Sequence, residues 1–343
     1  MEKRSLHWGL VSKYRTEIMG LACIWVVLHH YNNTMIFPDA LRPLYRFTVY
    51  GNAGVDIFLF LSGIGLFFAF QKDNIRLGVF YIKRIVRLLL PYILICVPYY
   101  IWVELYLKEG SFWLNVTQLS FPLSRMIATW YIPAMLVFYL LFPAIYKLQN
   151  TKKIKNHTAW VIMLSLFYVL FLLVVKNLFP TLYANTEIAL VRFIVFFVGC
   201  YFGHAVYEKK AFTTTTVAAA ATYTVLFVLM RATSALSNFW IRLGYGPLAV
   251  SLCVLAVYVL VWIKDGNPIF SVLRFFGNRS LEIYLTSVLL NNVWDAVIGA
   301  RHFDRWGAID YLIIVAVSIV ISTLAHIIIG WLSSLILRKR RGV

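Results

Sequence analysis

The chain has 343 residues, of which 61% are hydrophobic and only 13% are charged, and its formal net charge is +18. This composition is typical of an integral membrane protein and excludes an ordinary soluble enzyme. The basic residues lie in short loops between apolar runs, so the positive charge indicates membrane topology and not a nucleic-acid partner. No polar stretch reaches the size of a domain, and we therefore predict a single transmembrane domain over residues 1–343.

Ten apolar runs approach the roughly 20 residues that a helix needs to cross a hydrocarbon core. The predicted spans are residues 17–36, 54–71, 86–106, 130–147, 159–178, 188–206, 213–231, 246–263, 276–297 and 310–334. With the N-terminus inside, about two thirds of the 32 Lys and Arg residues fall in inside segments, including the final LRKRRGV. The sequence predicts an all-α polytopic bundle of about ten transmembrane helices with both termini inside.

Two adjacent histidines, His29 and His30, lie inside the first predicted span, in WVVLHHYNN. His30 follows Glu17 by roughly 20 Å along a helix axis, at about 1.5 Å per residue, which places it in the outer half of the membrane. Neighbouring helical side chains point about 100° apart, so we expect one histidine to serve a site and the other to pack. A ring that only bridges two helices is the alternative, although the cost of polar groups in a bilayer favours a functional role.

Asp56 lies at the start of the second predicted span, in GVDIFLFLSGIGLFF. Because this span runs inward, Asp56 and His30 are predicted at similar depth. Two roles fit this spacing equally well. The carboxylate orients the histidine ring and stabilises its cation, or it caps the helix start, where the helix dipole favours an anion.

A basic cluster lies between the second and third spans, in FYIKRIVRLLLPY. Lys83 and Arg87 share one helical face, Arg84 flanks them, and Lys72 and Arg76 precede them. Anchoring to lipid headgroups explains such a cluster without a substrate. The functional alternative is a phosphate clamp, because guanidinium groups match phosphate oxygens. Cytoplasmic phosphates combined with chemistry in the outer half require a long, thin donor, and acyl-CoA has that shape.

Aromatic residues Trp130 and Tyr131 open the fourth predicted span at the outer face. Interfacial aromatics usually form a belt, but flat rings also stack on sugars, so both are candidates for acceptor binding. Arg192 lies near the outer start of the sixth span. It is a candidate for a substrate carboxylate, with pairing to an acidic side chain as the favoured alternative.

Glu282 is predicted one to two turns inside the ninth span, where an unpaired carboxylate is costly. We expect it to pair with Arg279 or with a basic group near a donor entrance. His204 and His326 are expected to be packing or interfacial residues. The four cysteines are predicted to be buried packing residues, without a disulfide or a metal ion: Cys23, Cys96, Cys200 and Cys253.

Six ordered motifs resemble those of membrane acyltransferase family 3, whose members acylate sugars and other hydroxyl acceptors of the cell envelope. They are YRTEIMGLACIWVVLHHY, GVDIFLFLSG, FYIKRIVRLLLPY, TWYIPAMLVFYLLFP, FFVGCYFG and FFGNRSLEIYL. The resemblance is weak at roughly residues 148–187 and 205–268. No soluble SGNH-type domain is recognisable after the tenth span, so the membrane domain is expected to act alone or to pass its acyl group to a partner.

The resemblance assigns roles to individual residues. The family's first-helix histidine matches His30, its Gly-Val-Asp motif matches residues 54–56, and its Arg-x-x-Arg pair, implicated in acyl-CoA handling, matches Arg84 and Arg87. Two departures are visible. Many members carry an arginine ten residues before the histidine, whereas the nearest one here is Arg15, a partial substitute. Many also have a second histidine in the ninth-helix motif, at the position of Ser287.

The resemblance implies a membrane O-acyltransferase, with acetyl as the expected group, that moves an acyl group from cytoplasmic acyl-CoA to a hydroxyl of an envelope sugar, glycan or lipid-linked sugar. His30 is the expected general base, with His29 as the alternative, because a neutral imidazole suits proton removal. Direct transfer is favoured over an acyl-histidine intermediate. Acetyl-CoA is then a substrate and no cofactor is permanently bound. The expected location is a bacterial-type inner membrane.

Two other classes of protein fit the same residues. A proton-coupled secondary transporter would use His30, Asp56 and Glu282 as a proton relay. A polysaccharide-export component would carry out no chemistry. Consumption of acyl-CoA in detergent, where no gradient exists, separates the enzyme from both.

Overall fold

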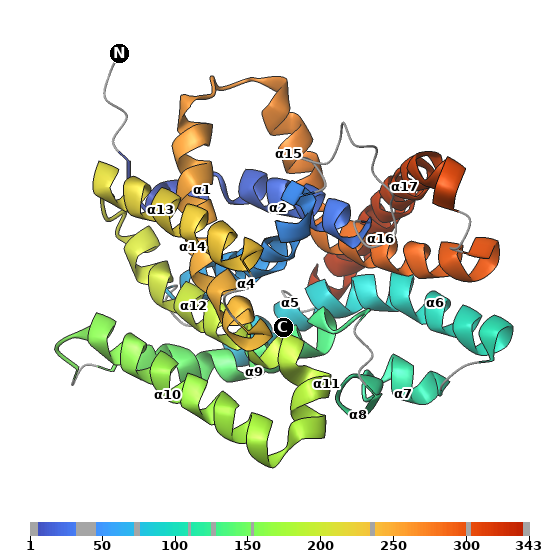
Figure 1. The fold of residues 1–343 in the computed structure, drawn as a ribbon, viewed down its shortest axis with the longest axis horizontal. Helices are drawn as coiled ribbons and strands as arrows, with labels where there is room; N and C mark the ends of the chain where they lie inside the picture. Colours follow the sequence, from blue (N-terminus) through green and yellow to red (C-terminus); the bar gives the residue numbers. More distant parts are fainter. Residues whose placement is uncertain are drawn as a thin grey trace. The chain divides into compact units, whose positions relative to one another are not determined.

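The computed structural model describes residues 6–31, 46–71, 76–108, 111–124, 128–151, 154–233, 237–299 and 303–338. Lys72 and the last five residues of the basic C-terminal stretch lie outside these residues. All regular elements of the described residues are helical (Figure 1). The predicted all-α class is therefore confirmed.

Eight helical stretches among the described residues are long and apolar enough to cross a membrane. They are Arg46–Phe70, Leu77–Leu107, Tyr131–Gln149, His157–Leu178, Pro180–Tyr207, Thr214–Ala232, Asn238–Trp262 and Ile309–Leu337. Each overlaps one predicted span. The described parts of the first and ninth predicted spans are also mainly helical, but α2 (Arg15–Tyr31) has 17 residues and α16 (Ser280–Trp294) has 15. The fold is a polytopic membrane bundle, whereas the count of ten and the side on which each terminus lies stay predictions.

The outward faces of these helices are apolar, which explains why the chain needs a lipid environment. Along α10 (His157–Leu178), Leu166, Phe167 and Leu170 are each at least 60% exposed. Apolar side chains at this density would be unfavourable in water, whereas lipid tails solvate them. The exposed hydrophobic side chains on the outward helix faces therefore agree with the prediction of a membrane protein.

The chain divides into two compact units, each assembled from three separate stretches. The first unit consists of Met1–Ala22, Ala53–Ile75 and Phe138–Asn278, and the second of Cys23–Asn52, Arg76–Val137 and Arg279–Val343. Helices α2 and α9 (Tyr131–Gln149) contribute residues to both. The units interleave along the sequence, so no single cut in the chain separates them. The single-domain prediction stays a prediction.

The first unit is built around the pairing of α4 and α12, with α14 packed against α4 and α13 against α14 (Figure 1). Its remaining helices are α1, α10, α11 and α15. Their bounds are α1 Gly9–Lys13, α4 Ala53–Phe70, α11 Pro180–Leu190, α12 Phe193–Tyr207, α13 Thr214–Ala232, α14 Asn238–Trp262 and α15 Pro268–Asn278.

Helices α4 and α12 approach each other at backbone distance because glycines face one another. A β-carbon on Gly63 would lie 2.5 Å from the Phe196 carbonyl oxygen, and one on Gly199 would overlap the Phe60 carbonyl. Small residues permit such close packing between membrane helices. The two motifs GVDIFLFLSG and FFVGCYFG therefore meet in space.

The second unit contains one long helical stretch, Leu77–Leu107, in which α-helical and π-helical segments alternate. Its other helices are α7, α8, α16 and α17, with the short turns η2 and η5. The bounds are η2 Val49–Asn52, α5 Leu77–Pro91, η3 Tyr92–Cys96, α6 Val97–Trp102, η4 Val103–Leu107, α7 Phe112–Val116, α8 Ser120–Ser124, η5 Asp295–Gly299 and α17 Phe303–Arg338. The π segment η3 lies between Pro91 and Pro98, which lack a backbone N–H and so disturb the regular hydrogen-bond ladder.

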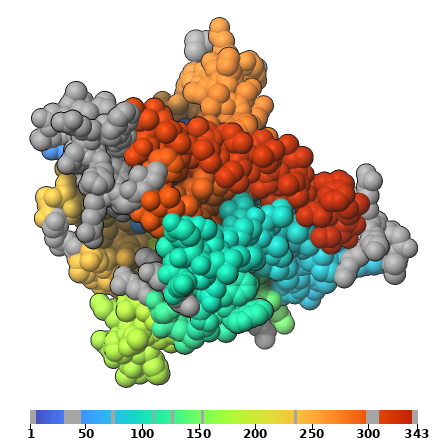
Figure 2. All heavy atoms as spheres, turned by 90° about the vertical axis from the view of Figure 1, so that its right-hand side faces the viewer, coloured from blue at the N-terminus to red at the C-terminus, as the bar shows by residue number. Residues whose placement is uncertain are grey.

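Helix α17 packs against both α5 and α16, and α16 also contacts η3. Figure 2 shows this side, where α17, in red, runs beside the cyan α5 segment. The helix that carries the basic cluster and the helix that carries Glu282 therefore belong to one packed group.

Candidate functional site

The two histidines of α2 have different surroundings, as helical geometry requires. His30 Nδ1 lies 2.8 Å from the Val26 carbonyl oxygen, one turn earlier, and His29 Nδ1 lies 3.2 Å from the Thr48 carbonyl oxygen. A carbonyl only accepts, so Nδ1 carries the hydrogen in both rings. In the neutral ring of His30, Nε2 is then the basic nitrogen.

An aromatic row, formed by Trp130, Tyr131, Tyr284 and His30, crosses the second unit. The ring of His30 lies 5.8 Å from that of Tyr284, centroid to centroid, and Tyr284 lies 6.2 Å from Tyr131. Tyr131 in turn lies 6.0 Å from Trp130, and all three contacts are edge-to-face. The structure therefore links the candidate base to the candidate acceptor-binding aromatics, which the sequence places about 100 residues apart.

The basic cluster lies on α5 in the same unit. Lys83 and Arg87 are exposed, and the Arg84 guanidinium lies 5.8 Å from the centre of the Phe80 ring. Arg76 is exposed and precedes the first residue of α5, where its carbonyl accepts the Phe80 N–H. Phe80 itself is buried, so its ring holds the Arg84 guanidinium against the body of the unit.

Asp56 lies in the first turn of α4, in the first unit, and is fully buried. Its Oδ1 is 3.3 Å from Nε of Arg192, a buried side chain at the start of α12. Arg192 also donates to the Ile188 carbonyl. Pairing of Arg192 with an acid, the favoured reading of the sequence, is therefore what the structure contains. Asp56 and His30 belong to different units, so orientation of His30 by Asp56 stays a prediction.

Glu282 is buried in the first turn of α16, closer to the helix start than expected from the sequence. Its Oε1 is 3.0 Å from Nδ1 of His326 on α17. His326 is expected from the sequence to be a packing or interfacial residue, and the structure adds this contact with Glu282, in which a hydrogen-bond donor stabilises a carboxylate buried among apolar helices. Ser287 is buried one turn further along and donates to the Tyr284 carbonyl.

Arg15 begins α2 in the first unit, with its guanidinium against Gly65 of α4. Two residues further along, buried Glu17 accepts a hydrogen bond of 2.7 Å from Arg274 on α15. Arg15 belongs to the first unit and the α5 cluster to the second, so a shared role in donor binding stays a prediction.

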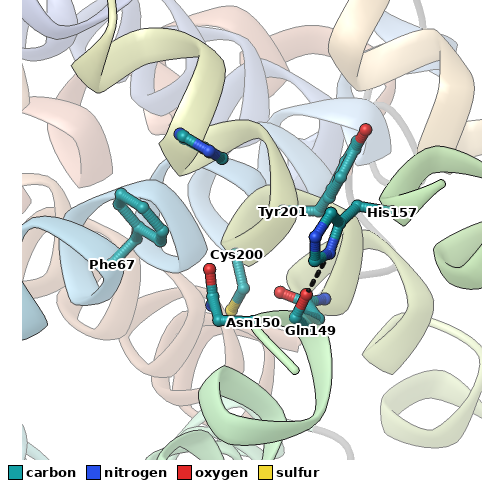
Figure 3. A pocket seen from close by; sticks show the side chains of 7 residues that line it. Phe67, Gln149, Asn150, His157, Cys200 and Tyr201 are labelled. Atoms are coloured by element: carbon teal, nitrogen blue, oxygen red, sulfur yellow. Dashed lines mark hydrogen bonds between the residues drawn. The ribbon is translucent and has the colours of Figure 1, made fainter. Parts of the chain in front are cut away.

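A cavity of about 160 Å³ lies at the ends of α4, α9 and α12 and the start of α10, all in the first unit (Figure 3). It is lined by Phe67, Gln149, Asn150, His157, Cys200, Tyr201 and His204. His157 donates to the Gln149 carbonyl across this cavity. None of the predicted site residues lines it, and of the residues expected to be packing or interfacial it contains Cys200 and His204.

Two residues of the site were missed by sequence reasoning. Tyr284 lies within the motif SLEIYL, so its position was visible, but nothing in the sequence placed its ring against His30. His326 lies in an apolar run without a motif. Burial of all four cysteines is confirmed. No group of three or more His, Cys, Asp or Glu side chains suited to a metal ion is present among the residues that the structure describes.

The fold and these residues define a polytopic helical membrane protein with an imidazole, a basic helix and an aromatic row in one compact unit. The chain belongs to the acyltransferase domain family (acyltransferase family 3), whose model matches residues 20–330. It is therefore a multi-pass membrane acyltransferase. Searches of curated proteins and of solved structures returned no match.

Proposed function

We propose that the protein is an acyl-CoA-dependent O-acyltransferase of a bacterial-type inner membrane that transfers an acyl group, acetyl in the first instance, to a hydroxyl of an envelope glycan or lipid-linked sugar. The observation that carries this proposal is the state of His30. Its Nδ1–H is bound to the Val26 backbone carbonyl, and the ring is partly exposed. A neutral imidazole with its Nε2 lone pair available is a general base.

The proposed step conserves protons. Nε2 of His30 accepts the hydroxyl proton as the acceptor oxygen attacks the thioester carbonyl. The carbon–sulfur bond then breaks, and the CoA thiolate takes the proton from the imidazolium. His30 returns to its neutral form, and no covalent intermediate on the ring is required. The hydrogen bond to the Val26 carbonyl keeps a hydrogen on Nδ1 of His30 throughout the reaction.

Donor binding is assigned to the helix that starts after Arg76. Lys83 and Arg87 project from one exposed face of α5, with Arg84 beside them. Cationic groups on one face match the diphosphate and ribose phosphate of CoA. The packing of α5 and η3 against α17 and α16 supports a donor that extends from this helix toward Tyr284 and His30.

Acceptor binding is assigned to the outer end of the aromatic row. Trp130 is buried and Tyr131 is partly exposed, so Tyr131 offers ring surface to a bound sugar. Tyr284 spans the distance from Tyr131 to His30. A sugar against Tyr131 would therefore present a hydroxyl in the direction of the candidate base.

The experiment uses purified protein in detergent, labelled acetyl-CoA and an envelope glycan fraction as acceptor. We expect acetyl transfer and CoA release, and a loss of about 10²- to 10⁴-fold in His30→Ala, the range of general-base catalysis. His29→Ala is the matched control, because its ring is tied to Thr48 instead of facing Tyr284. This control should retain activity.

Three other outcomes would contradict the proposed role of His30 or the proposed class of protein. Activity lost in His29→Ala and kept in His30→Ala would reverse the assignment within the pair. Full activity in both variants would exclude an imidazole base. No CoA release in detergent, combined with gradient-dependent uptake of a solute into vesicles, would identify a transporter instead.

A further inference from the structure

A closed ring of hydrogen bonds lies in the second unit, between the turn that joins α7 to α8 and the start of α9. Thr129 Oγ1 donates to Gln118 Oε1 at 2.8 Å, and Gln118 Nε2 donates to the Tyr100 hydroxyl at 3.3 Å. The Tyr100 and Thr129 hydroxyl oxygens are 2.7 Å apart. Since the single hydroxyl hydrogen of Thr129 goes to Gln118, Tyr100 donates to Thr129 and the ring closes in one direction.

Gln118 makes further contacts beyond this ring. Its Nε2 also lies 2.9 Å from the Tyr92 hydroxyl and 2.8 Å from the Asn115 carbonyl oxygen. The amide nitrogen has two hydrogens for three acceptors, so its contact with Tyr100, the longest of the three at 3.3 Å, shares a hydrogen with a neighbouring acceptor. Tyr92 passes its own hydrogen to the Val116 carbonyl at 2.6 Å. All of these side chains are buried or nearly so, and each is satisfied. Such fully paired buried networks hold one conformation, because any displacement leaves a polar group without a partner.

The backbone of Gln118 is held in the left-handed region, with φ of 61°. A long side chain rarely adopts this conformation, which costs on the order of 1–3 kcal/mol and persists only where surrounding contacts impose it. Here the contacts are the hydrogen bonds of its own amide. Lys108 and Lys209 adopt the same backbone conformation at exposed positions, so what sets Gln118 apart is that its side chain is buried and its amide is hydrogen-bonded.

The partners of Gln118 come from the two parts of the proposed site. Tyr92 directly follows α5, which carries the basic cluster, and Tyr100 lies on α6. Thr129 directly precedes Trp130 and Tyr131, the outer members of the aromatic row, and its carbonyl accepts the Ile132 N–H at the start of α9. One side chain thus joins the helix assigned to the donor to the residues assigned to the acceptor.

We propose that Gln118 is a positioning residue for the acceptor: it fixes Thr129, and through it the rings of Trp130 and Tyr131, at a set distance from Tyr284 and His30. This inference rests on the proposed function. Gln118 does not contact the reacting atoms. Loss of its amide should therefore impair transfer to a sugar while sparing chemistry that needs only the donor and His30.

The test compares two reactions of the same full-length variants. Hydrolysis of labelled acetyl-CoA by water is measured on purified protein in detergent. Transfer is measured as base-labile acetate in the envelope of cells that express the variant. For Gln118→Met and Thr129→Val, which keep shape and remove hydrogen bonds, we expect transfer to fall about tenfold or more and hydrolysis to stay within about twofold. Thr129→Ser keeps the hydroxyl and should restore transfer.

Gln149→Met is the matched control. Gln149 is the other strongly buried glutamine of the described residues, and it donates to the Phe197 carbonyl in the first unit. Equal loss of both reactions in Gln118→Met and Thr129→Val, or retention of transfer in both, would overturn the proposal. A Thr129→Ser variant as poor as Thr129→Val would do the same. A parent protein that performs neither reaction would instead refute the proposed function, and the inference with it.

Discussion

Buried charges in this protein lie opposite charges or donors from another helix. Asp56 faces Arg192, and Glu282 faces His326, although each pair joins residues far apart in the sequence. Removing water from a carboxylate is costly, so a buried acid persists only when a donor compensates it. The two pairs therefore explain how a membrane helix tolerates an acid at these positions without any catalytic role for the acid itself.

The Asp56–Arg192 pair gives a prediction about stability. Asp56→Ala leaves the Arg192 guanidinium buried without its carboxylate, and breaking a buried pair on one side costs about 3–5 kcal/mol. Asp56→Leu combined with Arg192→Leu removes both charges and should recover most of that loss. Thermal unfolding of the detergent-solubilised protein measures the difference. A double variant less stable than Asp56→Ala would contradict the ion-pair account.

At the scale of helices, the basic helix α5 of the second unit packs against α17, and His30 of α2 contacts Tyr284 of α16. Helix α5 buries Phe80 and Leu88 and leaves Lys83 and Arg87 outside, so its two faces differ clearly in polarity. Helix α4, by contrast, is buried along most of its length. Of these two helices, α5 is the one with a polar face that a soluble phosphate group could contact, whereas α4 serves packing.

The exposed face of α5 predicts donor affinity. Lys83→Ala with Arg87→Ala should weaken acetyl-CoA binding by about 1.5–3 kcal/mol for each charged hydrogen bond lost. Equilibrium binding of acetyl-CoA at several salt concentrations measures this, and the parent protein should lose affinity as salt rises. Lys147→Ala, an exposed lysine of the first unit, is the control. Unchanged affinity in the double variant would assign the cluster to lipid headgroups.

The glycine contact between α4 and α12 predicts a second effect at this scale. Gly199→Val would force the helices apart, since a β-carbon there already overlaps the Phe60 carbonyl. Overpacking of this kind costs about 1–3 kcal/mol or more. Gly330→Val on α17 is the matched control, because no atom lies within 4 Å of its β-carbon position. Equal melting temperatures for both variants would show that the close approach of α4 and α12 does not contribute to the stability of the fold.

At the scale of the whole molecule, the topology can be tested directly. The excess of basic residues on alternate segments predicts that both termini lie in the cytoplasm, which requires an even number of spans. A fluorescent reporter that folds only in the cytoplasm should be active at either end, and an alkaline phosphatase fused there should be inactive. Opposite results at the two ends would show that one of the predicted spans does not cross the membrane.

Sequence by itself determined the class of this protein, because long apolar runs and their basic flanks depend only on local composition. It also singled out His30, the α5 cluster and Trp130 with Tyr131 as candidates. Only the tertiary structure decided which of them meet: Tyr284 against His30, Arg192 against Asp56, and His326 against Glu282. Helices that are apolar on nearly every side carry little information about which face turns toward which neighbour, so contacts between distant segments emerge only when the helices pack.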